Sequence, residues 1–373
     1  MVMRVTMINS GKAARDIYAR HSNALNSRPE LWTYHHVFSK GGKSTLSTTP
    51  FNQLFANAKK AAPFSQAYMS QNLRLIDLET RQFLEESLAS QGQPIDPLRM
   101  LQRMLISVNL NLCWGRRIMS QSDPFLLELI ECEYKIMELR NMYTNFQDGI
   151  PFLRVWPLAS KSREARQIRV RRDAYLRALN EEMDEKMAGN EGMDCLRAEL
   201  LGQGDAFADE TDVLCMTMLG AGVGPSAGGL HWGMALLAVR QDIQEKAYQE
   251  LREYTGGDPS MHPLNNLDDN PGYWPTDPNI FMPERWLDPT CPQHFTFSLG
   301  ARSCAGTMLA KRMSYVFYAR LLSTFEVRLK EGSKFRLGAL EDSAWYALLS
   351  NPKGLEVELV PRNEEALRRA MSG

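Results

Sequence analysis

The stretch FSLGARSCAG, residues 297–306, decides how this chain is interpreted. It places Cys304 between two glycines and two residues after Arg302. The apolar residues after it recur every three to four positions, as on one face of a helix: Leu309, Met313, Val316 and Phe317. Cys304 is therefore expected at the N-terminus of a helix, where the helix dipole and free backbone N–H groups favour the thiolate form.

The defined residues of this stretch suit a flat, anionic ligand that carries an iron atom. A cysteine thiolate is a known ligand of haem iron. Gly300 and Gly306 lack side chains where such a ligand must approach the backbone. Arg302 is a permanent cation that can hold a carboxylate of the ligand. A free cysteine is more often buried and inert, but the surrounding pattern favours the haem interpretation.

The pattern Phe-x-x-Gly-x-Arg-x-Cys-x-Gly resembles the haem-binding loop of the cytochrome P450 family at every defined position. The resemblance implies that Cys304 is the axial ligand of the iron and that Arg302 binds a haem propionate. It implies that Phe297 shields the sulfur, while Gly300 and Gly306 shape the loop. The expected fold is mainly α, a P450-like helical fold with small β elements, in one domain over residues 1–373.

Other parts of the chain narrow the resemblance. Residues 24–29 (ALNSRP), 150–157 (IPFLRVWP) and 169–173 (RVRRD) are similar to fungal P450s of the phenylacetate hydroxylase group. The likeness extends over most of the chain. It implies a small aromatic substrate, or a metabolite derived from an aromatic compound.

A second motif lies inside a predicted long helix, residues 209–241. In the P450 family this helix would cross the distal face of the haem. Ala221 and Gly222 match the Ala-Gly pair of that helix, so the resemblance implies that both lie against the cofactor. Small residues there leave room for dioxygen and substrate and weaken the helix hydrogen bonds.

The family continues this motif with an acid and a threonine that help to deliver protons to iron-bound oxygen. This chain has Gly224 and Pro225 at those positions. Ser226, one residue later, is therefore the candidate catalytic residue, and substrate or water is the alternative. The same residues imitate a dinucleotide-binding fingerprint, Gly-x-Gly-x-x-Ala, but no alternation of strands and helices follows them.

One landmark of the family is present and another is missing. Residues 281–286 (FMPERW) resemble the Pro-Glu-Arg-aromatic segment that precedes the haem loop. The family places a helix with Glu-x-x-Arg ahead of that segment, yet the chain has this pattern only at residues 365–368, after Cys304. An internal deletion within residues 255–280 is therefore expected, and the N-terminal membrane anchor is expected to be missing before Met1.

Composition restricts the possible partners. The 373 residues carry a net charge of −1, which gives no support for nucleic acid as a partner. Six scattered cysteines without pairing rhythm indicate a reducing compartment. Cys291 and His294 have a ligand-like spacing, but no second pair lies nearby to complete a zinc site. No apolar run reaches the length of a membrane span. The family usually lies at the endoplasmic reticulum membrane and faces the cytosol, whereas the location of this chain stays open.

The resemblance implies a haem-thiolate monooxygenase. Such an enzyme uses O2 and electrons from NADPH, which a separate NADPH-cytochrome P450 reductase supplies, to hydroxylate a small-molecule substrate. The chain is expected to be a monomer. The alternative is a truncated P450-derived protein without catalytic activity, which binds haem weakly or not at all. The missing Glu-x-x-Arg helix and the replacement of the acid and threonine favour this alternative.

Overall fold

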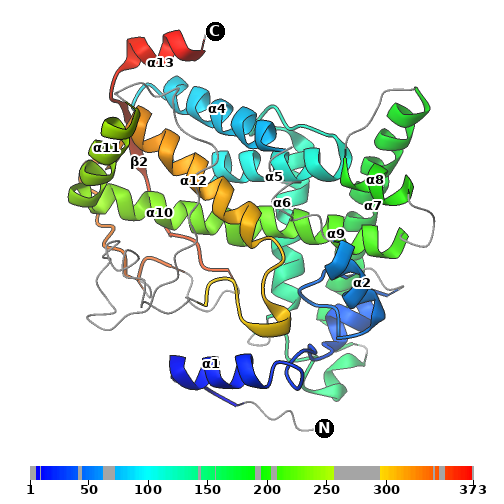
Figure 1. The fold of residues 1–373 in the computed structure, drawn as a ribbon. Helices are drawn as coiled ribbons and strands as arrows, with labels where there is room; N and C mark the ends of the chain where they lie inside the picture. The colour runs from blue at the N-terminus through cyan, green and yellow to red at the C-terminus, as the bar shows by residue number, and fades with distance from the viewer. Residues whose placement is uncertain are drawn as a thin grey trace.

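The computed structural model describes residues 6–8, 10–40, 44–61, 72–141, 144–155, 157–189, 195–202, 208–255, 295–338, 341–343 and 349–371. Helices dominate these residues, in agreement with the mainly α fold expected from the sequence (Figure 1). The helices are α1 (Gly11–Arg20), η1 (Trp32–Phe38), α2 (Gln53–Ala61), α4 (Leu73–Ala89), α5 (Leu98–Trp114), α6 (Pro124–Leu139), η2 (Pro151–Arg154), α7 (Ser160–Ala188), α8 (Leu196–Gly202), α9 (Ala208–Ala221), η4 (Gly222–Ser226), α10 (Ala227–Val239), α11 (Gln241–Thr255), η7 (Gly300–Arg302), α12 (Thr307–Thr324) and α13 (Glu364–Met371).

The small β element expected near the C-terminal end is also present. Strands β1 (Phe325–Leu329) and β2 (Val357–Pro361) pair antiparallel, with Phe325 opposite Pro361 and Leu329 opposite Val357. β1 continues directly from α12, and alternate residues of the strand are buried. This pairing holds the end of α12 against the rest of the fold.

A long central helix runs through the molecule, as predicted for residues 209–241. The elements α9, η4 and α10 follow one another without a break from Ala208 to Val239, and Figure 1 shows them crossing the middle of the molecule. The expectation that no segment could span a membrane was wrong on length and composition, since this helix qualifies on both. However, 67% of the most apolar 18-residue stretch of this helix is buried inside the protein, as is usual for a core helix.

The five residues of η4 form a π-helical turn with Pro225 inside it. Proline has no backbone N–H, so it cannot complete the α-helical hydrogen bond to the residue four positions earlier. A π turn places one extra residue in the helix and leaves its neighbours in helical conformation. The sequence predicted weakened helix bonds here, and the structure shows the form that this weakening takes.

The predicted apolar face of α12 is confirmed. Leu309, Met313, Val316 and Phe317 are all buried in the main hydrophobic core. The ring of Phe317 meets that of Phe83 on α4 edge to face, with 5.0 Å between centroids. Burying one such aromatic side chain contributes about 1.5–3 kcal/mol. This packing holds α12 in the core against α4, and it thereby positions the loop that precedes α12.

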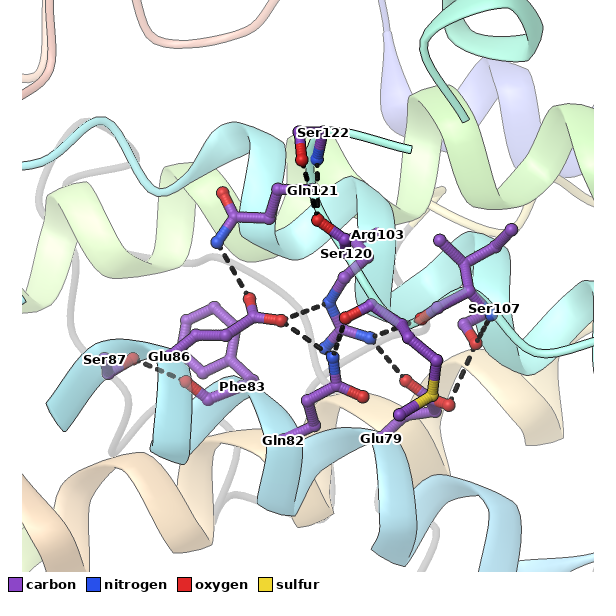
Figure 2. A network of polar contacts seen from close by, with 12 residues as sticks. Glu79, Gln82, Phe83, Glu86, Ser87, Arg103, Ser107, Ser120, Gln121 and Ser122 are labelled. Atoms are coloured by element: carbon purple, nitrogen blue, oxygen red, sulfur yellow. Dashed lines mark hydrogen bonds and ion pairs between the residues drawn. The ribbon is translucent and has the colours of Figure 1, made fainter. Parts of the chain in front are cut away.

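A buried ion network joins α4 to α5 (Figure 2). The Arg103 guanidinium is fully buried and lies 2.6 Å from carboxylate oxygens of both Glu79 and Glu86. Arg117 also contacts Glu79 at 2.6 Å, and the Ser107 hydroxyl donates to the same carboxylate at 2.9 Å. A buried ion pair contributes little net stability, but it makes the loss of one partner costly. The network therefore fixes how α4 lies on α5.

Candidate functional site

A cavity of about 520 Å³ lies between the central helix and the loop before α12. The central helix, α2, α12 and residues 296–306 supply most of its wall, together with three cationic side chains. Residues of these elements that line it include Phe55, Leu214, Met218, Ala221, Leu230, Phe297, Cys304, Leu309 and Met313. Most of this wall is apolar, as expected of a pocket that binds a large flat ligand.

The predicted loop places Cys304 at this cavity. Its backbone N–H donates to the Phe297 carbonyl at 2.8 Å, which closes the loop across seven residues. The Thr307 hydroxyl donates to the Cys304 carbonyl at 2.8 Å, and Gly306 is the N-cap of α12. Cys304 is exposed, whereas the other cysteines that the structure describes are buried. Its thiol is therefore accessible to a ligand in the cavity.

Gly300 fits the loop against α1. Its φ of +65° lies in the left-handed region that favours glycine. A Cβ atom at this position would lie 2.6 Å from the Tyr18 carbonyl oxygen and 2.9 Å from Ser22 Cβ. Helix α1 begins at Gly11 after the Ser10 N-cap and ends at Arg20. Gly300 is thus needed for the close approach of the loop to this helix.

Gly306 has a milder role than the sequence implied. A Cβ atom at this position would lie 3.9 Å from the Cys304 sulfur, which is an ordinary van der Waals contact. Apart from its chain neighbours and its own helix backbone, no other atom of the described residues lies within 4 Å of it. Gly306 lines the cavity, and its lack of a side chain leaves space beside the thiol.

Arg302 also lies at the cavity, with more partners than the sequence indicated. Its guanidinium donates to the carbonyls of Asn26, Leu46 and Thr49, the last two at 3.3 and 2.9 Å. It also stacks 3.8 Å from the centroid of the Phe55 ring. Burial, and then the charge of Arg28, lower the pKa of Arg302 to about 10.

Two further cations line the cavity that were not predicted from the sequence. Lys59 on α2 donates from Nζ to the Ala301 carbonyl at 2.6 Å, and Arg28 donates from Nε to the Ser47 carbonyl at 3.2 Å. Both line the cavity beside Arg302. Burial, and then the charge of Arg302, lower the pKa of Lys59. No aspartate or glutamate is among the described residues that line the cavity, so the site favours an anionic ligand.

The residues proposed on the central helix separate into two groups. Ala221 and Ser226 both line the cavity, as does Pro225 between them. Gly222 does not line it. A Cβ atom at Gly222 would lie 2.6 Å from Asn109 Nδ2, so this glycine permits close packing against α5. The expectation that Gly222 contacts the cofactor does not fit this position.

Some sequence predictions lie outside the described residues. These are the Pro-Glu-Arg segment at residues 281–286, the spacing of Cys291 and His294, and residues 256–280 of the predicted deletion. The Gly-x-Gly-x-x-Ala pattern, in contrast, falls within the central helix, where η4 passes into α10. It therefore does not form the strand–turn–helix of a dinucleotide site.

The residues present fit haem. Within the part of the chain that the structure describes, the cavity has an accessible thiol, cations with no aspartate or glutamate in the wall beside them, and open space at Gly229, where a Cβ atom would have no neighbour within 4 Å. Haem is flat, carries two propionates and takes a thiolate as axial ligand. Such a site, in a helical fold with its cysteine in the C-terminal third, is typical of haem-thiolate proteins.

Comparison with known proteins gives the family. The cytochrome P450 family model matches residues 1–268 and 261–359. This chain belongs to the cytochrome P450 family. A solved structure of a zebra fish cytochrome P450 with progesterone shares the fold, with a TM-score of 0.73 and 20% sequence identity. It covers 94% of this chain, and 92% of that protein is matched.

Among curated relatives, 3-hydroxyphenylacetate 6-hydroxylase of Emericella nidulans is 30% identical over 430 positions, covering 99% of this chain and 82% of the relative. Phenylacetate 2-hydroxylase of the same organism is 28% identical, covering 98% and 83%. The 430 aligned positions exceed the 373 residues of this chain, so the first relative has residues without a counterpart here. The resemblance to fungal hydroxylases of this group is thereby confirmed.

Proposed function

We propose that this protein is a haem-thiolate monooxygenase that hydroxylates a small aromatic metabolite. The observation that carries the proposal is the accessible Cys304 thiol at a cavity lined by cations and apolar side chains. The relatives named above support the aromatic substrate class. In the overall reaction one atom of O2 enters a C–H bond and the other leaves as water. Two electrons come from NADPH through a separate cytochrome P450 reductase.

Haem with a thiolate ligand supplies the activation of dioxygen when it is bound. Cys304 would be the axial ligand, and Arg302 and Lys59 would hold the propionates. Phe297, whose carbonyl accepts from the Cys304 N–H, also lines the cavity and would shield the sulfur. Leu214 and other apolar residues of the wall keep water away from the reacting region.

Ser226 is the proposed proton donor of the site. It reaches the cavity wall together with Ala221, five residues earlier. The intervening π turn makes this possible, because residues five apart in an α-helix point about 140° away from each other. Its hydroxyl would hold a proton at the cavity wall and relay it from water. Water held by the substrate is the alternative donor.

The missing Glu-x-x-Arg pattern favours a second candidate, a P450-derived chain that holds haem weakly and does not turn over. The decisive measurement is the carbon monoxide difference spectrum of the reduced, haem-reconstituted protein. Cys304→Ser is the test variant, and Cys215→Ser, at a buried cysteine of α9, is the control. A red-shifted Soret band of a thiolate–CO complex in the wild type and control, absent in Cys304→Ser, supports the enzyme. A neutral-ligand band in the wild type refutes it.

Partners and location follow the family. We propose a monomer that receives electrons from the reductase at the cytosolic face of the endoplasmic reticulum. Co-purification of the reductase with microsomes that contain the protein, and reductase-dependent consumption of NADPH, would support this arrangement. A chain found only in the soluble fraction would argue against the membrane location.

A further inference from the structure

Helix α5 presents two amide side chains to the central helix. Gln102 and Asn109 lie seven residues apart, or about two turns, so both point from the same face of α5. Gln102 Nε2 donates to the Val223 carbonyl at 3.3 Å, and Asn109 Nδ2 donates to the Met218 carbonyl at 2.6 Å. Val223 lies within the π turn, whereas Met218 lies about one turn before it. The two amides therefore bind the central helix on both sides of the point where the π turn begins.

The Val223 carbonyl has lost its α-helical donor. In an α-helix it would accept from the N–H of Ala227, four residues later. In this structure the Ala227 N–H donates to the Gly224 carbonyl instead. Val223 is fully buried, and a buried carbonyl that loses its hydrogen bond is costly. Gln102 supplies a donor in place of this N–H.

The Gln102 side chain is held in place and lies outside the cavity. Its Nε2 also donates to the Tyr134 hydroxyl on α6 at 3.0 Å, and the same hydroxyl accepts from Asn351 Nδ2 at 2.9 Å. Both hydrogens of the Gln102 amide thus have acceptors, which fixes its orientation. Gln102 is 2% exposed and is not among the residues that line the cavity, whereas Asn109 is among them. Gln102 therefore influences the site through the central helix and not by contact with a ligand in the cavity.

We propose that Gln102, assisted by Asn109, is a positioning residue that keeps η4 in its π-helical form and thereby holds Ser226 at the cavity wall. This inference rests on the proposed function, in which Ser226 relays the proton. Ser226 lies three residues after Val223, so a rotation of the Val223 carbonyl towards a backbone N–H would change the winding of the turn that carries the hydroxyl. Ala221 and Ser226 would then no longer face the cavity together.

The orientation of residue 226 can be measured in the protein as purified, without haem. Ser226→Cys places a thiol at the wall, and its alkylation by iodoacetamide is followed at this residue by peptide mass spectrometry. Adding Gln102→Leu or Asn109→Leu should slow this alkylation about two- to tenfold, the range that corresponds to the loss of one hydrogen bond. Gln244→Leu is the matched control, because Gln244 is also buried and donates to a carbonyl of α10, that of Leu237, away from the π turn. The control should leave the alkylation rate unchanged.

A double-mutant cycle in the haem-loaded enzyme distinguishes positioning from general destabilisation. With phenylacetate as the probe and the reductase present, Gln102→Leu should lower the product formed per NADPH about two- to tenfold, but it should cause no further loss in a Ser226→Ala background. Equal alkylation rates in Gln102→Leu and Gln244→Leu overturn the proposal, and so does an equal loss of product in both backgrounds. If the haem-loaded protein forms no product, the proposed function fails, whereas the alkylation rates still decide whether Gln102 positions residue 226.

Discussion

Substitution of Gly300 by alanine tests how the cysteine loop is held against α1. At a φ of +65° a residue with a Cβ atom costs about 1–2 kcal/mol. In addition, the new Cβ would lie 2.6 Å from the Tyr18 carbonyl oxygen, a backbone atom that cannot rotate away. Overpacking of this kind typically costs about 1–3 kcal/mol. Gly300→Ala is therefore expected to lower the free energy of unfolding by about 2–5 kcal/mol.

Gly332 provides a matched control for this substitution. Its φ is +74°, and a Cβ atom there would meet nothing within 4 Å. Gly332→Ala should therefore show only the conformational cost of about 1–2 kcal/mol. Any stabilisation of alanine through the unfolded chain is common to both variants and cancels in the comparison.

Urea denaturation of both variants measures the difference, and the Soret absorbance per protein chain reports the effect on the site. Gly300→Ala should lose haem as well as stability, because the loop that carries the thiol must move away from Tyr18. Gly332→Ala should keep its haem. Equal losses of stability in the two variants, with haem retained in both, would refute the account of how the loop is positioned.

Three further predictions concern the site and its support. In the unliganded fold, burial and the charge of Arg302 lower the pKa of Lys59 from 10.5. Lys59 therefore loses its proton at a lower pH than an ordinary lysine does. Because the neutral amine binds a propionate weakly, haem affinity should fall as the pH rises through this lowered pKa. Lys59→Gln should remove this alkaline decline and weaken haem binding at pH 7 about tenfold, measured by haem dissociation. Arg103→Met should cost about 3–5 kcal/mol in urea denaturation, because Glu86 and the buried Glu79 lose the guanidinium that they share, although Arg117 still contacts Glu79. Replacing both glutamates by glutamine should recover much of this loss. Gly222→Ala should cost about 1–3 kcal/mol, since its Cβ atom would lie 2.6 Å from Asn109 Nδ2 on α5. Because Asn109 itself lines the cavity, a smaller loss of haem than in Gly300→Ala is expected, and haem loss at unchanged stability would contradict this placement.

Local patterns were enough to predict several elements. The central helix extends over nearly the predicted residues, and the predicted apolar face of α12 is buried. Each of these depends on residues a few positions apart, which the sequence displays directly. The family, and with it the mainly α fold, could be predicted in the same way, because all the defined residues of the motif lie within residues 297–306.

Contacts between distant segments could not be predicted. Lys59 reaches Ala301 across 242 residues, and nothing in the sequence near Lys59 marks it as part of a site. The packing of Gly222 could not be predicted for another reason. Its contact with Asn109 depends on how α5 packs against the central helix, and periodicity within one helix does not specify its partner.

The π turn also has a consequence for how this family member can change over generations. Deleting one residue from η4 would restore a regular α-helix, but it would rotate all of α10 by about 100° relative to α9. Met234 and Ala235, now fully buried, would then leave the core, and other residues of α10 would be turned into it. A single deletion is therefore not a neutral step back. With α10 packed in its present rotation, the extra residue is difficult to remove in one step, and functional variants of this sequence should retain the π turn even where the residues within it differ.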